Sequence, residues 1–247
     1  MRIFETLGFR GLFRGLVLGL TALLAGCVSL GGGGDAAPRA AQVTADAVTI
    51  TGPEGFCVDP DLTRNDGDTG FVLLGNCAAI SGRARAPQPD IQAVLTATVA
   101  ARSEPGGGLT GALDELDGFF RSDAGQALLS RSGEAESITI LETRVAADMF
   151  LLHARDSSPA AVVGVAQDYW RAYLDLGPRL ATLSVLALAD QDVSDEQALL
   201  TLVTFADAVA QANTGLTGGA IAADLPQAGA QGGGTLFQGG LFQRIFR

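Results

Sequence analysis

The single histidine of the chain, His153, is the side chain that could most readily transfer a proton near neutral pH. Asp156 and Ser157 follow it, so the three residue types of a serine hydrolase occur within a few positions. Closeness in sequence is not triad geometry, however, and the sequence lacks a Gly-x-Ser-x-Gly nucleophile elbow, a phosphate-loop spacing and a His-Glu-x-x-His motif. We therefore predict no catalytic residue and no cofactor, and we keep a hydrolase that uses His153 or paired carboxylates as an alternative.

The stretch from Asp59 to Gly70 is rich in side chains that bind cations. Its members of that kind are Asp59, Asp61, Asn65, Asp66 and Asp68. An EF-hand calcium loop needs alternating acidic residues followed by a Glu at its twelfth position, and no Glu lies near this stretch. The sequence therefore predicts a solvated acidic turn here, and we predict no metal site.

Cys57 and Cys77 are separated by 19 residues. A metal site would need further ligands, and neither a His nor a Cys-x-x-Cys pair lies near these thiols. In an oxidising compartment the two residues are expected to form a disulfide, which would stabilise the fold by about 3 kcal/mol in the chain-entropy model. Free thiols remain the alternative.

The N-terminal segment has the pattern of an export signal. Arg2, Arg10 and Arg14 precede an apolar run from Leu16 to Leu24, which is shorter than the about 20 residues that span a bilayer as a helix. The run ends in Leu24-Ala25-Gly26-Cys27, which resembles the lipobox of bacterial lipoproteins. That resemblance implies cleavage before Cys27 and attachment of lipid, including palmitate, to its sulfur. An ordinary signal peptide or an uncleaved anchor with a free Cys27 is the alternative.

The lipobox resemblance implies a location and a membrane partner. The protein would be anchored by its lipid in the cell envelope, because two or three acyl chains hold a protein to a membrane durably. Val28 stands where Asp would favour retention in the inner membrane, so we expect the outer membrane, with the domain facing the periplasm.

The net charge argues against nucleic acid as a partner. Removing residues 1–26 takes away three Arg and one Glu, which leaves 13 basic and 26 acidic side chains and a formal charge of −13. Such a surface repels nucleic acid, and it also repels anionic lipid headgroups. All 16 basic residues are Arg, which we attribute to coding bias.

The composition divides the chain into five parts. Residues 1–26 are the signal peptide, and the small residues of 27–46 predict a flexible tether. Residues 47–213 are expected to form one domain. The Gly-rich and Ala-rich stretch 214–234 predicts a disordered linker, and 235–247 forms a hydrophobic C-terminal peptide with two Arg.

Within the domain, apolar patterns predict both strands and helices. The expected strands are 47–50, 56–58, 71–74, 91–99, 137–145, 149–154, 162–174 and 180–188. Helices are expected from Leu109 to Phe120, after Ser122 or Asp123, and from Asp192 or Ser194 to Asn213. The strand 180–188 is apolar on both sides, so it should lie centrally beneath helices.

Consecutive strands joined by short turns, with helices inserted early and placed last, predict an α+β fold in which helices cover an antiparallel sheet. The Gly55-Phe56-Cys57-Val58-Asp59 hairpin, the meander from Ile138 to Leu188, the Gly177-Pro178-Arg179-Leu180 strand entry and the closing helix after Asp195-Glu196 resemble the PsbP-like fold over about residues 47–213. This resemblance implies an α/β/α sandwich and a role in binding or assembly, and it carries over no functional residue. The exported chain also resembles uncharacterised lipoproteins of alphaproteobacteria.

Two groups of residues are candidates for binding a partner. Tyr169, Trp170, Arg171 and Tyr173 cluster on one expected strand, where Tyr169, Arg171 and Tyr173 would face one way and Trp170 the other. They are also ordinary strand residues. The C-terminal peptide offers Phe237, Phe242 and Phe246, which could dock into a partner groove, lie at a membrane interface or fold back on the domain.

The sequence favours a lipid-anchored envelope protein with a non-catalytic binding or assembly role, whose partner is another envelope protein. This hypothesis rests on the lipobox resemblance, the aromatic C-terminal peptide and the lack of a catalytic motif in the sequence. Besides the hydrolase, a carrier of a small apolar ligand remains an alternative, because an apolar cavity leaves no sequence motif.

Overall fold

The computed structural model describes residues 36–103, 108–158 and 164–217. The lipidation candidate Cys27 and the C-terminal candidates Phe237, Phe242 and Phe246 lie outside these residues. The described helices and strands all belong to one compact unit that starts at Asp35. Among the described residues, no helix is both long enough and apolar enough to cross a membrane.

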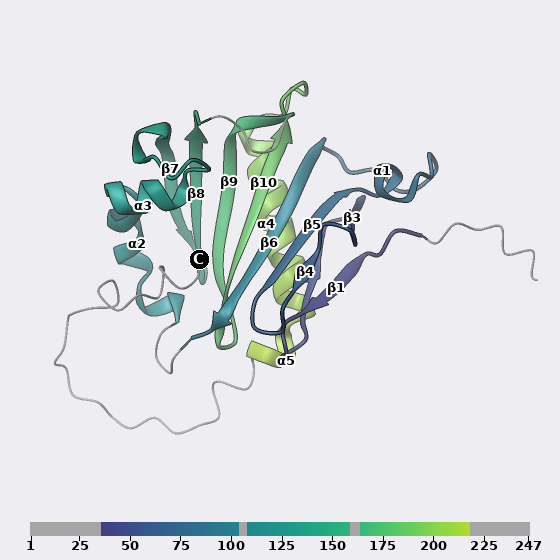
Figure 1. Ribbon diagram of the computed structural model, residues 1–247, viewed down its shortest axis with the longest axis horizontal. Helices are drawn as coiled ribbons and strands as arrows, with labels where there is room; N and C mark the ends of the chain where they lie inside the picture. The colour runs from purple at the N-terminus through teal and green to yellow at the C-terminus, as the bar shows by residue number, and fades with distance from the viewer. Residues whose placement is uncertain (1–35, 104–107, 159–163, 218–247) are drawn as a thin grey trace, which may run out of the picture. The chain divides into compact units, whose positions relative to one another are not determined.

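The centre of the domain is an antiparallel sheet with the strand order β3-β5-β6-β10-β9-β8-β7, and β4 pairs with β5 beside it (Figure 1). A separate pair is formed by β1 and β2. The strands are β1 (Ala40–Val43), β2 (Val48–Thr51), β3 (Phe56–Val58), β4 (Arg64–Asn65), β5 (Gly70–Asn76), β6 (Ala93–Arg102), β7 (Ile138–Ala146), β8 (Met149–Asp156), β9 (Val165–Leu176) and β10 (Arg179–Leu188).

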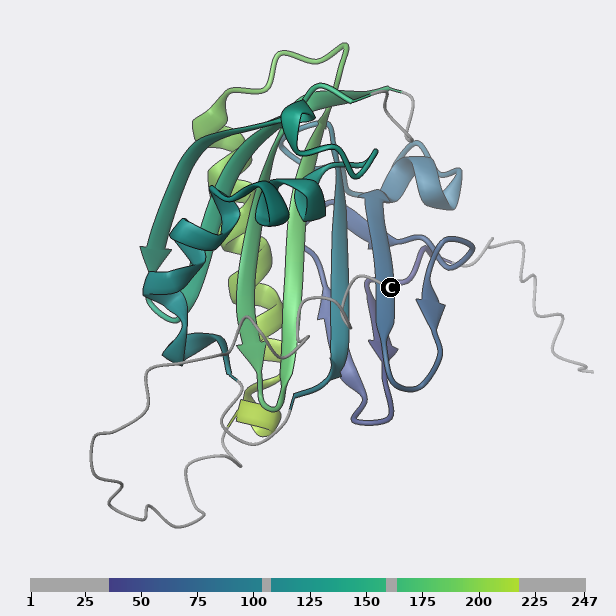
Figure 2. The same ribbon diagram turned by 60° about the vertical axis from the view of Figure 1, so that its left-hand side comes forward.

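Helices lie on both faces of this sheet (Figures 1 and 2). The long helix α4 (Asp195–Ala212) crosses one face, and α2 (Leu113–Phe120) and α3 (Asp123–Leu129) lie on the other. The remaining helices are α1 (Cys77–Ser81), α5 (Thr214–Thr217) and two 3-10 turns, Leu109–Gly111 and Ala135–Ser137.

Each helical layer buries its own core. On the α4 face, Leu202, Phe205 and Val209 pack with Leu95 and Leu183 of the central strands. On the opposite face, a second cluster includes Phe120, Phe150 and Tyr173, with the Phe120 and Tyr173 rings stacked 5.0 Å apart. Because alternate residues of a strand point to opposite faces, the two cores are built from alternate positions of the same strands.

Local sequence signals explain where the elements begin and turn. Ser194 caps α4 and forms a capping box with Gln197. Ser122 caps α3 through the Gly125 N–H. Between β9 and β10 the chain turns in two residues, where Gly177 has a φ of 62° that L side chains rarely adopt. This tight turn fixes the register between β9 and β10.

The structure confirms the α+β class, the antiparallel sheet and the central place of β10. Two expectations were wrong. The strand β1 lies within residues 27–46, which were expected to be a tether, and its alternation ends in the buried Val43. Likewise α5 lies within the expected linker 214–234. The short elements β4 and α1 were not predicted.

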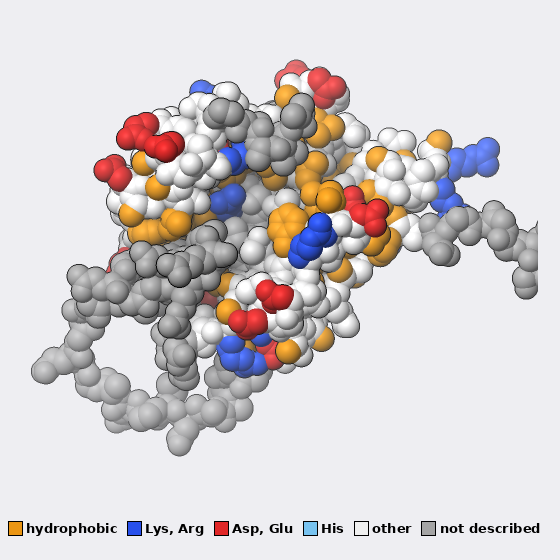
Figure 3. Space-filling view, viewed as in Figure 1, with side chains coloured by type: hydrophobic (Ala, Val, Ile, Leu, Met, Phe, Trp, Pro, Cys, Tyr) orange, Lys and Arg blue, Asp and Glu red, His pale blue; other side chains and the backbone are white. Residues whose placement is uncertain are grey.

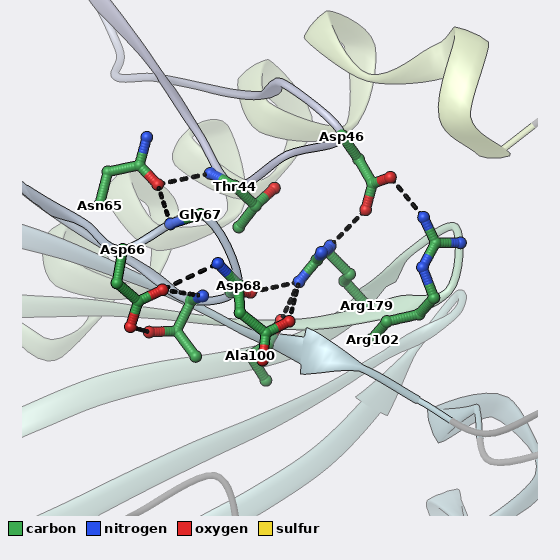
Figure 4. Close-up of polar contacts among 10 residues, drawn as sticks. Thr44, Asp46, Asn65, Asp66, Gly67, Asp68, Ala100, Arg102 and Arg179 are labelled. Atoms are coloured by element: carbon green, nitrogen blue, oxygen red, sulfur yellow. Dashed lines mark hydrogen bonds and ion pairs between the residues drawn. The ribbon is translucent and has the colours of Figure 1, made fainter.

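A buried arginine ties the β1–β2 pair to the sheet (Figure 4). The Arg179 side chain is 3% exposed, and its Nε donates to Asp46 Oδ2 at 2.6 Å. Its Nη1 donates to the carbonyl oxygens of Ala100, at 2.9 Å, and of Asp68. Arg102 binds the other oxygen of Asp46. The hydrogen bond from Arg179 lowers the pKa of Asp46. Because Asp46 and two main-chain carbonyl oxygens take up the hydrogen bonds of Arg179, we infer that this cluster stabilises the fold.

Candidate functional site

One face of the sheet carries a polar row across its middle. The strand pairings place Leu73 opposite Thr96, Thr96 opposite Ser184, and Ser184 opposite Arg171. In the adjacent row, Phe71 lies opposite Thr98, Thr98 opposite Thr182, and Thr182 opposite Tyr173. We call this the open face. It is the face on which α2 and α3 lie, because Tyr173 belongs to the core beneath α2.

Among the described residues, helices lie at both ends of the open face, and none of these helices crosses its middle. At one end α2 and α3 cover β7 and β8, and at the other end Ile80 of α1 lies over Gly75 of β5. Between them, the β6 residues Val94, Thr96 and Thr98 are only half-buried. Figure 3 shows a recess over the middle of the sheet with arginine atoms inside it. The described helices therefore leave the middle of the open face uncovered.

Arg171 of β9 stands near the centre of this face. Its Nε donates to Ser184 Oγ at 3.0 Å, and its guanidinium carbon lies 4.9 Å from the centre of the Tyr169 ring. Among the described residues Arg171 forms no ion pair, and its guanidinium interacts with the Tyr173 hydroxyl. The side chain is only partly exposed. The planar fork of a guanidinium matches the two oxygens of a carboxylate.

The lack of a carboxylate partner sets Arg171 apart. Within the described ranges, three arginines are not exposed at the surface: Arg131, Arg171 and Arg179. Arg131 lies 3.7 Å from the buried Asp156, and Arg179 binds Asp46. Charges that leave bulk water normally have a counter-charge, because desolvation is expensive. Asp156 acts on Arg171 only through its charge, and among the described residues no acid forms an ion pair with Arg171, so this arginine is the candidate for binding an external anion.

The hydroxyl of Tyr173 is a second polar group near the centre of this face. Tyr173 is 1% exposed, and within the described part of the chain its oxygen has no hydrogen bond of good geometry. Burial raises the pKa of Tyr173 to about 12, while the nearby cation of Arg171 acts to lower it. The phenol is therefore a neutral donor beside Arg171. A buried hydroxyl without a partner destabilises a fold by about 1–3 kcal/mol, which a ligand oxygen would relieve.

Apolar side chains border the polar rows on the open face. Phe71 and Leu73 of β5, Val94 of β6 and Leu186 of β10 are half-buried there. Leu73 lies three strands from Arg171, which corresponds to about 14 Å across the sheet. The open face thus combines one cation, several hydroxyls and an apolar border.

His153 lies on the other side of the sheet from the polar rows. It is 6% exposed, its ring stacks on Trp170 at 4.4 Å, and its Nε2 lies 3.7 Å from Asp195 Oδ1. Asp156 belongs to the opposite face of β8, where it accepts hydrogen bonds from Ser158 and the Arg131 N–H. Ser157 donates to the Ser137 carbonyl. His153, Asp156 and Ser157 therefore do not form a catalytic triad.

His153 does border a cavity of about 480 Å³, together with Asp168, Trp170, Gln191 and Asp195. Burial lowers the pKa of His153, while Asp195, Asp168 and Glu142 act to raise it. Among the described residues, no serine, threonine or cysteine side chain hydrogen-bonds to His153. This cavity consequently lacks an assembled nucleophile and base in the part of the chain that the structure describes.

Two carboxylates of the acidic loop accept hydrogen bonds within the loop. Asp59 accepts hydrogen bonds from the N–H groups of Asp61 and Leu62, and Asp66 accepts from those of Asp68 and Thr69. Within the described ranges, no three His, Cys, Asp or Glu side chains are grouped closely enough to hold a metal ion.

The structure divides the expected partner-binding cluster as the strand pattern predicted. Tyr169, Arg171 and Tyr173 lie on the open face, and Trp170 packs on the α4 face. Cys57 and Cys77 form the expected disulfide. Thr96, Thr98 and Ser184 were not predicted as site residues, although hydroxyl residues alternate with apolar ones in both β6 and β10. That alternation is the signal that the open face is not fully covered.

The comparisons with known proteins add no family. No protein-family model matches the chain, and no match was found among curated protein sequences or solved structures.

Proposed function

We propose that this chain is a lipid-anchored envelope protein with a non-catalytic binding role, and that the open face holds its ligand or partner. The observation that carries the proposal is Arg171, a partly buried cation that has no acid beside it in the described part of the chain. The lipobox at Cys27 supports the anchor, an outer-membrane location and an orientation toward the periplasm.

We propose that the group recognised at Arg171 is a single carboxylate. One arginine supplies one positive charge, and its planar fork fits a carboxylate in a bidentate manner. A doubly charged phosphate would meet a chain with 27 acidic side chains, and of the two partly exposed arginines described on this face Arg131 already pairs with Asp156. The half-buried Leu73 and Phe71 favour an apolar portion beside the carboxylate. An envelope protein that presents such a chain end would satisfy both requirements.

The α/β/α sandwich of the PsbP-like resemblance remains part of this proposal. Helices on both faces of the sheet support it. That resemblance also favours binding or assembly over catalysis.

Photo-crosslinking in cells tests the binding role. A benzophenone amino acid at Leu73, on the open face, should form adducts with the bound partner. The same amino acid at Leu200, which is 68% exposed on α4, serves as the control position. We expect adducts at Leu73 that fall at least about fivefold in Arg171→Met, since one charge-assisted hydrogen bond contributes about 1.5–3 kcal/mol.

Arg121→Met is the matched control, because Arg121 is exposed and paired with Asp117. Its adducts should equal those of the wild type. Adducts that persist in Arg171→Met, or that are absent at Leu73, would overturn the role of the open face. The anchor is tested separately: Cys27→Ala should abolish palmitate incorporation and release the protein from membranes.

A further inference from the structure

A second recess lies beside the disulfide, away from the middle of the open face. It has a volume of about 520 Å³ and is bordered by Ala36 and Ala37, by the Cys57–Cys77 disulfide, and by the segment that follows α1, from Arg83 to Pro87. Alanine, proline and the disulfide make much of its wall apolar. Its position at the first described residues places it where the chain arrives from Cys27.

Three arginines surround this recess. Arg39, Arg83 and Arg85 all border it, and all three are exposed. Among the described residues, none of these three side chains forms an ion pair or a hydrogen bond. Of the described residues that border the recess, none is an Asp or a Glu. Figure 3 shows arginine atoms beside apolar surface at the α1 end of the domain.

The side chains around this recess are positively charged, whereas the chain as a whole is negatively charged. The chain carries a formal charge of −11. Of the other exposed arginines that the structure describes, Arg64 donates to two carbonyl oxygens, and the remaining four are each paired with an acid: Arg102, Arg121, Arg144 and Arg155. Three unpaired arginines around an apolar recess therefore create a local positive field. The overall charge predicts repulsion from anionic headgroups, but a field within the Debye length of about 8–10 Å is set by the nearest charges.

The length of the chain before the recess limits its distance from the anchor. Ala36 is the ninth residue after Cys27, with eight residues between them, and a fully extended chain spans at most about 3.3–3.6 Å per residue. The recess therefore stays within about 32 Å of an acylated Cys27. This step rests on the proposed lipid anchor.

We propose that the face formed by Arg39, Arg83 and Arg85 contacts the membrane, and that these arginines bind the phosphates of anionic phospholipids. Arginine binds phosphate oxygens in a bidentate manner, and the apolar wall lies against the boundary between headgroups and acyl chains. The lipid then attaches the chain, and the arginine face orients the domain on the surface.

Quenching of tryptophan fluorescence by brominated lipids tests this contact. Full-length acylated protein carrying Ala84→Trp is reconstituted into phosphatidylglycerol or phosphatidylcholine vesicles that contain brominated lipid. Ala84 is exposed in the recess, whereas the native Trp170 is 2% exposed and supplies the background. We expect at least about twofold quenching on the anionic vesicles. Each arginine near an anionic surface changes the equilibrium by about fivefold, so R39Q/R83Q/R85Q should abolish the effect.

The triple variant R121Q/R144Q/R155Q is the matched control, because it removes the same charge from exposed arginines away from the recess. In Ala84→Trp protein, this control triple variant should leave the quenching the same as in Ala84→Trp protein that keeps all its arginines. Protein that floats with vesicles but is not quenched, or is quenched equally in both triple variants, overturns the membrane contact. Protein that does not float with vesicles at all contradicts the anchor, and with it the membrane contact that depends on it. The two failures are thereby distinguished.

Discussion

Ser184 accepts a hydrogen bond from Arg171 Nε at 3.0 Å across the β9–β10 pair. The two residues are direct partners in the register that the Gly177-Pro178 turn sets. This bond holds Nε of the guanidinium, and the Tyr173 hydroxyl also interacts with the group. A donor pair that is already oriented loses less conformational freedom when it binds a ligand, so the arrangement favours recognition.

Tyr173→Phe separates binding from stability. The Tyr173 hydroxyl is buried without a good hydrogen bond, so its removal should leave the free energy of unfolding unchanged or raise it by up to about 1 kcal/mol. If the hydroxyl helps to hold a ligand carboxylate, adducts from the Leu73 crosslinker should nevertheless fall several-fold. Urea unfolding and crosslinking yield check both parts. A large loss of stability would show that the hydroxyl has a structural partner.

Arg179→Met should destabilise the domain without touching the open face. The substitution removes a 3% exposed cation that joins Asp46, the Asp68 carbonyl and the Ala100 carbonyl. We expect a loss of about 3 kcal/mol, as for other broken buried pairs. Arg155→Met breaks the exposed pair with Asp168 and should change stability by at most about 1 kcal/mol. Equal effects of the two variants in urea unfolding would contradict the structural role of Arg179.

His153 should make the domain less stable in mild acid. Burial lowers its pKa in the folded state below the ordinary value of 6.5, so the unfolded chain binds its proton first. Stability should therefore fall as the pH drops from 6.5 toward the folded pKa, whereas the lowered pKa values of Asp46 and Asp156 act only below about 4. His153→Phe, which keeps an aromatic ring on Trp170, should remove this dependence. An unchanged profile between pH 7 and 5 would contradict the assignment.

Much of the fold was readable from local signals. Ser122 and Ser194 mark helix starts because their side chains satisfy free N–H groups, and the alternation in 91–99 marks a strand with two different faces. The strand β1 was not predicted because an alternating pattern cannot be recognised in only four residues. Its pairing with β2 also depends on contacts from outside the segment. Similarly, α1 is a five-residue helix whose N-cap, Asn76, also ends β5.

The candidate site was only partly predictable. The alternation of Tyr169, Arg171 and Tyr173 placed them on one face, but no sequence pattern showed which arginine would lack an acid. That property depends on Ser184 and Thr96, which reach Arg171 through strand pairing across 13 and 75 residues of chain. His153 and Asp156 show the same limit, because residues that are near in sequence can lie on opposite faces of a strand.

The central claim is that Arg171 binds a carboxylate, and a nuclear magnetic resonance titration of the arginine Nε–H signals tests it most directly. Octanoate is the probe, with acetate and inorganic phosphate for comparison and Arg121→Met as the matched variant. We expect octanoate to shift the Arg171 signal at lower concentration than acetate or phosphate, because Leu73 and Phe71 contact its chain. The shift should vanish in Arg171→Met and persist in Arg121→Met. An Arg171 signal that does not move, or that moves equally with all three anions, would contradict the account.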